Sequence, residues 1–146
     1  MTTQEPGETT LYDHVGGFDA LLAVVRRWHE LCLADPVAAH PFARPLHRQH
    51  DERLAAYLAQ ALGGPALYTA GYGDESFVQR LHAGNGEGDA LQEACLRLFD
   101  VALDDVGVPV AAARDLSAYF REAASAMRAY QDDADLVPDD LPFRTA

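Results

Sequence analysis

Apolar residues recur along this chain at intervals of three and four positions. Ala and Leu fill most of these positions, and the alternation of Val or Ile with polar residues that is typical of half-buried strands is missing. A spacing of three and four places side chains on one face of a helix. The pattern therefore predicts an all-α protein.

Turn and stop signals divide this pattern into separate helices. The pair Gly16-Gly17 permits positive φ where the chain changes direction, Asp35-Pro36 ends a helix because the residue before Pro avoids helical geometry, and Gly63-Gly64-Pro65 gives another stop. The expected helices cover a short turn at 11–17, then 18–34, 47–62, a short run capped by Asp74 that carries His82, 89–105 and 110–131. Residues 36–47 are expected to form a turn-rich corner that presents Phe42, and 66–74 to form a loop.

The length of 146 residues fits one domain that is large enough to enclose a cofactor. We expect this domain to span residues 11–131, after a polar N-terminal extension over 1–10. Residues 132–146 contain five Asp and two Pro with few apolar side chains. Such a composition predicts an acidic, disordered tail.

Charge and hydropathy exclude two classes of partner. The formal net charge is −12 and the 11 basic residues are scattered along the chain, so no cationic surface for nucleic acid is expected. No segment approaches the roughly 20 apolar residues of a membrane span, and the first ten residues lack the features of a secretory leader. A cytoplasmic protein without a membrane partner is predicted.

The two cysteines and the clustered histidines give little sign of a metal site by themselves. Cys32 and Cys95 fall on separate expected helices and are interpreted as small buried apolar side chains. His40, His47 and His50 lie close in sequence, but no nearby Cys completes the four ligands of a structural zinc site.

The order and spacing of the landmarks carry a more specific signal. They are Leu11-Tyr-Asp-x-Val-Gly-Gly17, then Asp35-Pro36, Phe42, Gly63-Gly64-Pro65 and His82. Over about residues 9–130 this series resembles the truncated hemoglobins, and the distance from Gly63 to His82 is most similar to group II of that family. The resemblance implies a two-over-two helical sandwich that encloses heme b.

On the proximal side, the resemblance implies that His82 is the iron ligand. A neutral imidazole can bind iron through Nε2 while a backbone carbonyl one turn earlier, near Val78, holds the Nδ1 proton. Arg53 occupies a position similar to that of the family's propionate-pairing base, and Arg80 is a second candidate. The alternative is that both are solvated helix charges.

On the distal side, this chain departs from the pattern that it resembles. His29 stands where the family usually has Tyr, and Cys95 stands where group II usually has an indole. Phe42 matches the aromatic residue that packs on the heme face. His50 and Leu54, four residues apart and hence on one helix face, occupy the two positions that overlook the iron.

Distal imidazoles permit two different chemistries. An imidazole that stands back from the iron can donate its N–H to bound O2, whereas one that reaches the iron becomes a sixth ligand. The first case predicts a protein that binds O2 reversibly, and also NO or CO, as in oxygen transport. The second predicts a bis-His heme, with His50 or His29 as the sixth ligand, that acts as a redox or gas-sensing module.

Enzymatic turnover is a further expectation from the resemblance. NO dioxygenation or peroxidase-like activity would need electrons from a separate reductase, because the sequence contains no nucleotide-binding glycine motif. A heme-free helical interaction protein is the third alternative. The sequence leaves open the physiological ligand and whether the protein is a monomer or a homodimer.

Overall fold

The computed structural model describes residues 9–43, 48–83, 88–130 and 133–146, and over these ranges the chain is helical without strands, as predicted. The elements are α1 (Leu11–Val15), α2 (Gly17–Leu33), η1 (His40–Ala43), α3 (His50–Ala61), α4 (Leu67–Gly71), α5 (Glu75–His82), α6 (Asp89–Val106), α7 (Val110–Met127), η2 (Arg128–Tyr130) and η3 (Ala134–Leu136), where η marks a short 3₁₀ helix. Predicted and observed helix ends agree within a few residues. His47, expected to start a helix, lies outside the described residues.

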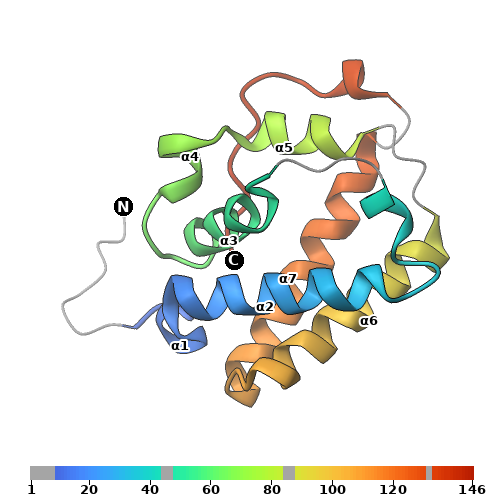
Figure 1. The fold of residues 1–146 in the computed structure, drawn as a ribbon. Coiled ribbons are helices and arrows are strands. Elements are labelled where there is room, and N and C mark those ends of the chain that lie inside the picture. Colours follow the sequence, from blue (N-terminus) through green and yellow to red (C-terminus); the bar gives the residue numbers. More distant parts are fainter. Residues whose placement is uncertain (1–8, 44–47, 84–87, 131–132) are drawn as a thin grey trace.

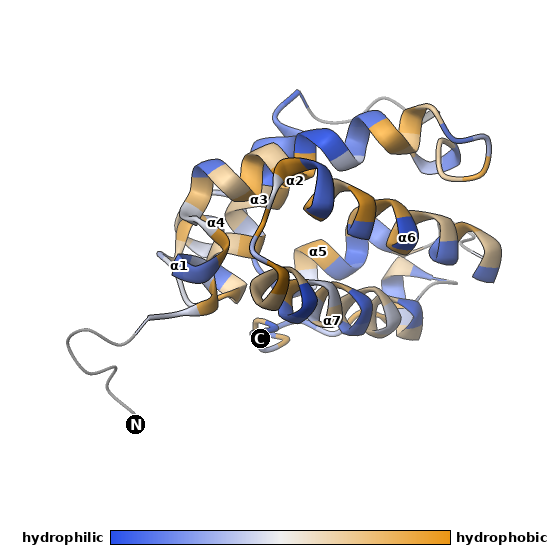
Figure 2. Ribbon diagram, turned by 90° about the horizontal axis from the view of Figure 1, so that it is seen from below, coloured by the Kyte–Doolittle hydropathy of each residue, from blue (hydrophilic) through white to orange (hydrophobic). Residues whose placement is uncertain are grey.

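Four long helices form the body of the protein. Helix α2 packs against both α3 and α6, and α6 packs against α7. Figure 1 shows α5 on the opposite side of the molecule from α2, and its main contact among the described elements is with η3. The ribbons of α2, α6 and α7 alternate between hydrophilic and hydrophobic residues in Figure 2, and apolar side chains of each helix are buried in the core.

Aromatic rings form the centre of the core. The rings of Phe99 and Phe120 stack with centroids 3.8 Å apart, which joins α6 to α7. Trp28 on α2 meets Phe99, Phe120 and Phe42 edge-on at centroid distances of 6.1, 5.5 and 5.6 Å. Edge-to-face contacts of this kind add to the free energy gained from burial. Trp28 thereby fixes η1, which carries Phe42, against the body of the protein.

Two of the predicted glycine landmarks have clear steric causes. Gly16 ends α1 and begins α2 with φ of +114°, a left-handed conformation that is strained for other residues. At Gly64 a Cβ atom would lie 2.6 Å from the ring of Tyr12 and 2.8 Å from the carbonyl oxygen of Ala59. The second glycine pair therefore allows α1 to pack closely against the end of α3.

Two expectations from the sequence differ from the structure. The predicted loop at 66–74 contains the short helix α4, which buries Tyr68 at 3% exposure. The predicted disordered tail lies instead along α5 and α3 over residues 133–146. Phe143 packs on Tyr57 at a centroid distance of 4.7 Å, and the amide of Ala146 donates to the carbonyl of Ala61 at 2.9 Å.

Residues 133–146, the tail, are held by polar contacts that their average composition does not predict. The amide of Arg144 donates to Glu75 Oε1 at 2.9 Å, and the hydroxyl of Tyr57 donates to the same oxygen at 2.7 Å. Burial raises the pKa of the nearby Tyr119 phenol to about 12, and this hydroxyl donates to the carbonyl of Arg144. A few well-placed residues therefore order a segment that is acidic overall.

None of the helices in the described ranges combines the length and the apolar character that crossing a membrane requires.

Candidate heme site

His82, the residue expected on the proximal side of a heme, is the last residue of α5. Asp74 caps the start of this helix by accepting a hydrogen bond from the amide of Phe77 at 2.8 Å, as predicted. His82 Nδ1 lies 2.8 Å from the carbonyl oxygen of Val78, one turn earlier. Because a carbonyl oxygen only accepts, Nδ1 carries the proton, and a neutral ring then keeps a lone pair on Nε2. That lone pair is what an iron ligand requires.

Arg80 is engaged by the tail. Its guanidinium donates to the carbonyl oxygen of Val137 at 3.2 Å and forms an ion pair with Asp139. Ser76, on the same helix, donates to the carbonyl of Pro138 at 2.8 Å. Arg80 therefore fastens the tail to α5, and its expected contact with a propionate stays a prediction.

The expected distal residues come together from three elements. His29 lies on α2, Phe42 on η1, and His50 is the first residue of α3. The ring of Phe42 is 4.7 Å from that of His29 and 6.0 Å from that of His50, and the two imidazole centroids are 5.5 Å apart. Leu54, one turn after His50, is half-buried against the same core.

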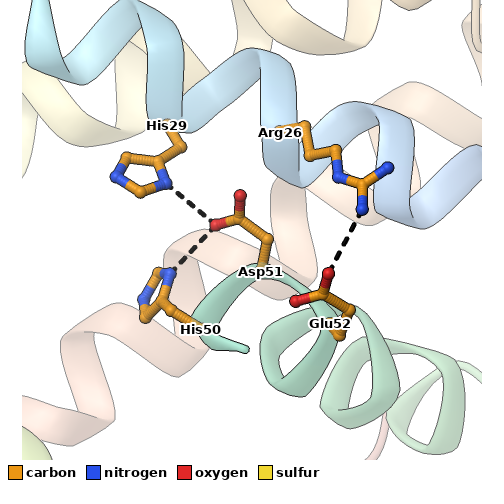
Figure 3. Close-up of polar contacts among 5 residues, drawn as sticks. All are labelled: Arg26, His29, His50, Asp51 and Glu52. Carbon is orange, nitrogen blue, oxygen red and sulfur yellow. Dashed lines mark hydrogen bonds and ion pairs between the residues drawn. The ribbon is translucent and has the colours of Figure 1, made fainter. Parts of the chain in front are cut away.

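Asp51 connects the two distal imidazoles. Its Oδ1 lies 2.9 Å from His29 Nδ1 and 3.0 Å from His50 Nδ1, so one carboxylate oxygen accepts from both rings. Figure 3 shows that the other nitrogen of each ring points away from Asp51. The three side chains are 21%, 30% and 22% exposed for His29, His50 and Asp51.

This arrangement determines the tautomer of both distal imidazoles. A carboxylate can only accept, so each Nδ1 must carry a proton. In the neutral form each Nε2 then holds a lone pair, which can coordinate a metal but cannot donate to bound O2. His29 and His50 are therefore prepared for ligation in the same way as His82.

Cys95 faces a neighbour that the sequence pattern did not indicate. A hydrogen bond to Cys95, together with burial, raises the pKa of the Cys32 thiol, and the two residues bridge α6 and α2. The indole of Trp28 donates to the backbone carbonyl of Cys95 at 2.9 Å. Neither thiol forms a disulfide. Cys32 is buried as interpreted, whereas Cys95 is only half-buried, and the two residues are closer together than expected.

Arg53 has the properties expected of a propionate partner. Its guanidinium carbon lies 5.0 Å from the ring centroid of Tyr72, and its buried Nε has no hydrogen-bond partner among the residues that the structure describes. A buried donor without an acceptor is costly, and a carboxylate would satisfy it. Together with the lone pair on His82 Nε2, this unpaired donor fits a heme with its propionates.

The comparisons with known proteins agree with this geometry. A family model described as bacterial-like globin matches residues 10–129. The chain belongs to the bacterial-like globin family. It is therefore a heme-binding globin, and the all-α fold places it with the truncated hemoglobins.

Solved structures give the same assignment. This globin is 30% identical to the hemoglobin of the thermophilic phototrophic bacterium Chloroflexus aurantiacus, with a TM-score of 0.72 over 82% of this chain and 98% of that one. It is 26% identical to the group II 2-on-2 hemoglobin of Agrobacterium tumefaciens, with a TM-score of 0.72 over 85% and 97% of the two chains. No curated protein matches the chain.

Sequence reasoning missed one important residue of this site. Asp51 was not singled out, although a carboxylate directly after a candidate distal imidazole is a signal that could have found it. Its contact with His29, 22 positions away, depends on how α2 packs against α3 and is not visible in the sequence.

Proposed function

We propose that this globin holds heme b through His82 and binds O2, and also NO or CO, reversibly at the iron. The observation that carries the proposal is the hydrogen bond from His82 Nδ1 to the carbonyl of Val78, which leaves Nε2 as a lone pair and fixes the ring plane. The heme supplies the iron at which a diatomic ligand binds. The chain supplies the protein ligand to the iron, the apolar side chains around the heme, and the positive charge that pairs with a propionate.

Each group of residues has a separate part in this proposal. Phe42 and Leu54 provide apolar surface that excludes water, and Arg53 pairs with a propionate. Oxygen transport needs only reversible binding. Turnover of NO or of a peroxide would also need electrons from a separate reductase.

The test is a gas titration of the purified, reduced protein. We expect one heme per chain and spectral changes with CO and with O2 that reverse when the gas is removed. Failure to retain heme after reconstitution, or a ferrous spectrum that does not respond to CO, would overturn the proposal.

A second candidate function rests on Asp51. This carboxylate accepts hydrogen bonds from both Nδ1 atoms, so each neutral ring keeps its lone pair on Nε2, which faces away from Asp51. His50 or His29 could then act as a sixth ligand and give a bis-His heme. A heme held in this way would exchange its internal ligand for a gas, as in a redox or gas-sensing module.

Kinetics of CO binding separate the two functions. An internal ligand must leave before CO enters, so the observed rate should level off at high CO concentration for a bis-His heme. A rate that stays proportional to CO concentration would support simple reversible gas binding.

A further inference from the structure

We propose that His29, His50 and Asp51 form a second metal site, for a divalent first-row transition ion, on the distal side of this globin. One potential ligand atom from each of the three residues lies within 4.8 Å of the other two. Two imidazoles and one carboxylate are the donor set of non-heme iron sites that leave open coordination positions. The proposed ion uses the Nδ1 atoms that face Asp51, whereas the heme iron would be ligated through Nε2.

The distances within the cluster match such a site. Bonds of about 2.1 Å at right angles place neighbouring ligand atoms about 3.0 Å apart. The distances from Asp51 Oδ1 to the Nδ1 atoms of His29 and His50 are 2.9 and 3.0 Å. These are also the lengths of the two hydrogen bonds to Asp51, so an ion that displaces the two Nδ1 protons would find two of the three ligand-to-ligand distances close to the required value.

Neighbouring residues pack against the two imidazoles, and the carboxylate of Asp51 pairs with these imidazoles. The ring of Phe42 packs against both imidazoles, with centroid distances of 4.7 and 6.0 Å. The cation drawn in Figure 3, Arg26, is paired with Glu52 at 3.2 Å beside the cluster, and no dashed line joins either residue to the imidazoles or to Asp51. Within the part of the chain that the structure describes, Asp51 forms its ion pairs with His29 and His50, so its negative charge belongs to the cluster.

Metal binding at Nδ1 would change what each imidazole presents to the heme. A neutral imidazole carries one proton, so an ion on Nδ1 moves that proton to Nε2. The Nε2 atoms then change from lone pairs, which can ligate iron, to donors, which can hold bound O2. This consequence rests on the proposed heme function, whereas the metal site itself does not.

The experiment counts zinc and observes the heme in the same sample. The full-length, heme-loaded protein is stripped with a chelator and dialysed against Zn²⁺, and zinc per chain is measured separately from heme iron. We expect one zinc per chain. Asp51→Asn and His50→Gln should each weaken zinc binding at least tenfold, and the ferrous heme should shift from six-coordinate to five-coordinate as zinc binds to the unsubstituted protein.

Two matched variants control for adventitious binding. Glu52→Gln removes the neighbouring carboxylate, and His14→Ala removes an exposed histidine on α1, so both should bind zinc normally. No zinc on the unsubstituted protein, or equal binding by Asp51→Asn and His50→Gln, would overturn the site. One zinc per chain with an unchanged visible spectrum would support the site and overturn its coupling to the heme.

Discussion

The proposed proximal and distal sides of this globin hold their imidazoles by the same kind of contact with different acceptors. On the proximal side, His82 donates to a backbone carbonyl four residues earlier on the same helix. On the distal side, His29 and His50 donate to one carboxylate oxygen, and the contact joins α2 to α3. The first acceptor is neutral and local, and the second is charged and depends on tertiary packing.

This difference determines how each side can change. A backbone carbonyl is present at position 78 whatever the side chain, so the proximal tautomer follows from the helix alone. The distal tautomers depend on Asp51, and one substitution at this position would remove the charged acceptor of both imidazoles. We therefore expect the proximal side to determine whether heme is retained and the distal side to determine what the heme binds.

Replacement of His82 should have the largest effect. Loss of a partner behind a metal ligand typically costs 10- to 100-fold in affinity, and loss of the ligand itself should cost more. We expect His82→Gly to release heme at least about a hundredfold faster, measured by transfer to an excess of apomyoglobin. Added imidazole should restore much of the retention. Heme release at the rate of the unsubstituted protein would contradict the proposal that His82 is the residue that retains the heme.

Replacement of Asp51 should have the next largest effect, and only on the distal side. Asp51→Asn removes the charge that fixes both Nδ1 protons, so the equilibrium constant for distal ligation should fall by roughly tenfold or more. The proportions of six- and five-coordinate ferrous heme in the absorption spectrum measure this change. Glu52→Gln should leave them unaltered, because Glu52 pairs with Arg26 and contacts neither imidazole. The same shift in both variants would assign the effect to surface charge.

The two distal imidazoles should differ from each other. His29 lies on Phe42 with centroids 4.7 Å apart and planes tilted by 30°, whereas the His50 side chain is more exposed, at 30% against 21%. His50 therefore has more freedom to reach the iron. We expect His50→Leu to speed CO binding by roughly tenfold, an effect of about 1.4 kcal/mol, and His29→Leu to change it less. The reverse ranking would make His29 the sixth ligand.

The smallest expected effect concerns the propionates. Arg53→Leu should weaken heme retention about fivefold, since a partly exposed charge pair contributes about 1 kcal/mol. Arg80→Leu should change heme release less, because Arg80 is occupied by the tail residues Val137 and Asp139. Equal heme release rates in the two variants would contradict the proposal that Arg53 pairs with a propionate.

The sequence was most informative where contacts are local. Helix periodicity and the Gly and Pro stops placed the long helices, and the spacing of α5 anticipated the bond between His82 and Val78. It was least informative where distant segments meet. The pairing of Cys32 with Cys95, and the link from His29 to Asp51, require the packing of α2 against α6 and α3.

The tail shows a related limit of composition. Five Asp within residues 132–146 predict a solvated segment. Val137 is nevertheless 5% exposed, and Phe143 packs against Tyr57, so two apolar residues at suitable positions outweigh the average. Average composition does not record which face of a segment meets the core.

The visible spectrum of the chelator-treated, reduced protein without added gas tests the central claim most directly. That claim is that Asp51 leaves a lone pair on each distal Nε2, so that an internal sixth ligand competes with the reversible gas binding proposed above. The account predicts a low-spin, six-coordinate ferrous heme that becomes largely five-coordinate in Asp51→Asn. A high-spin, five-coordinate ferrous heme in the unsubstituted protein would contradict it.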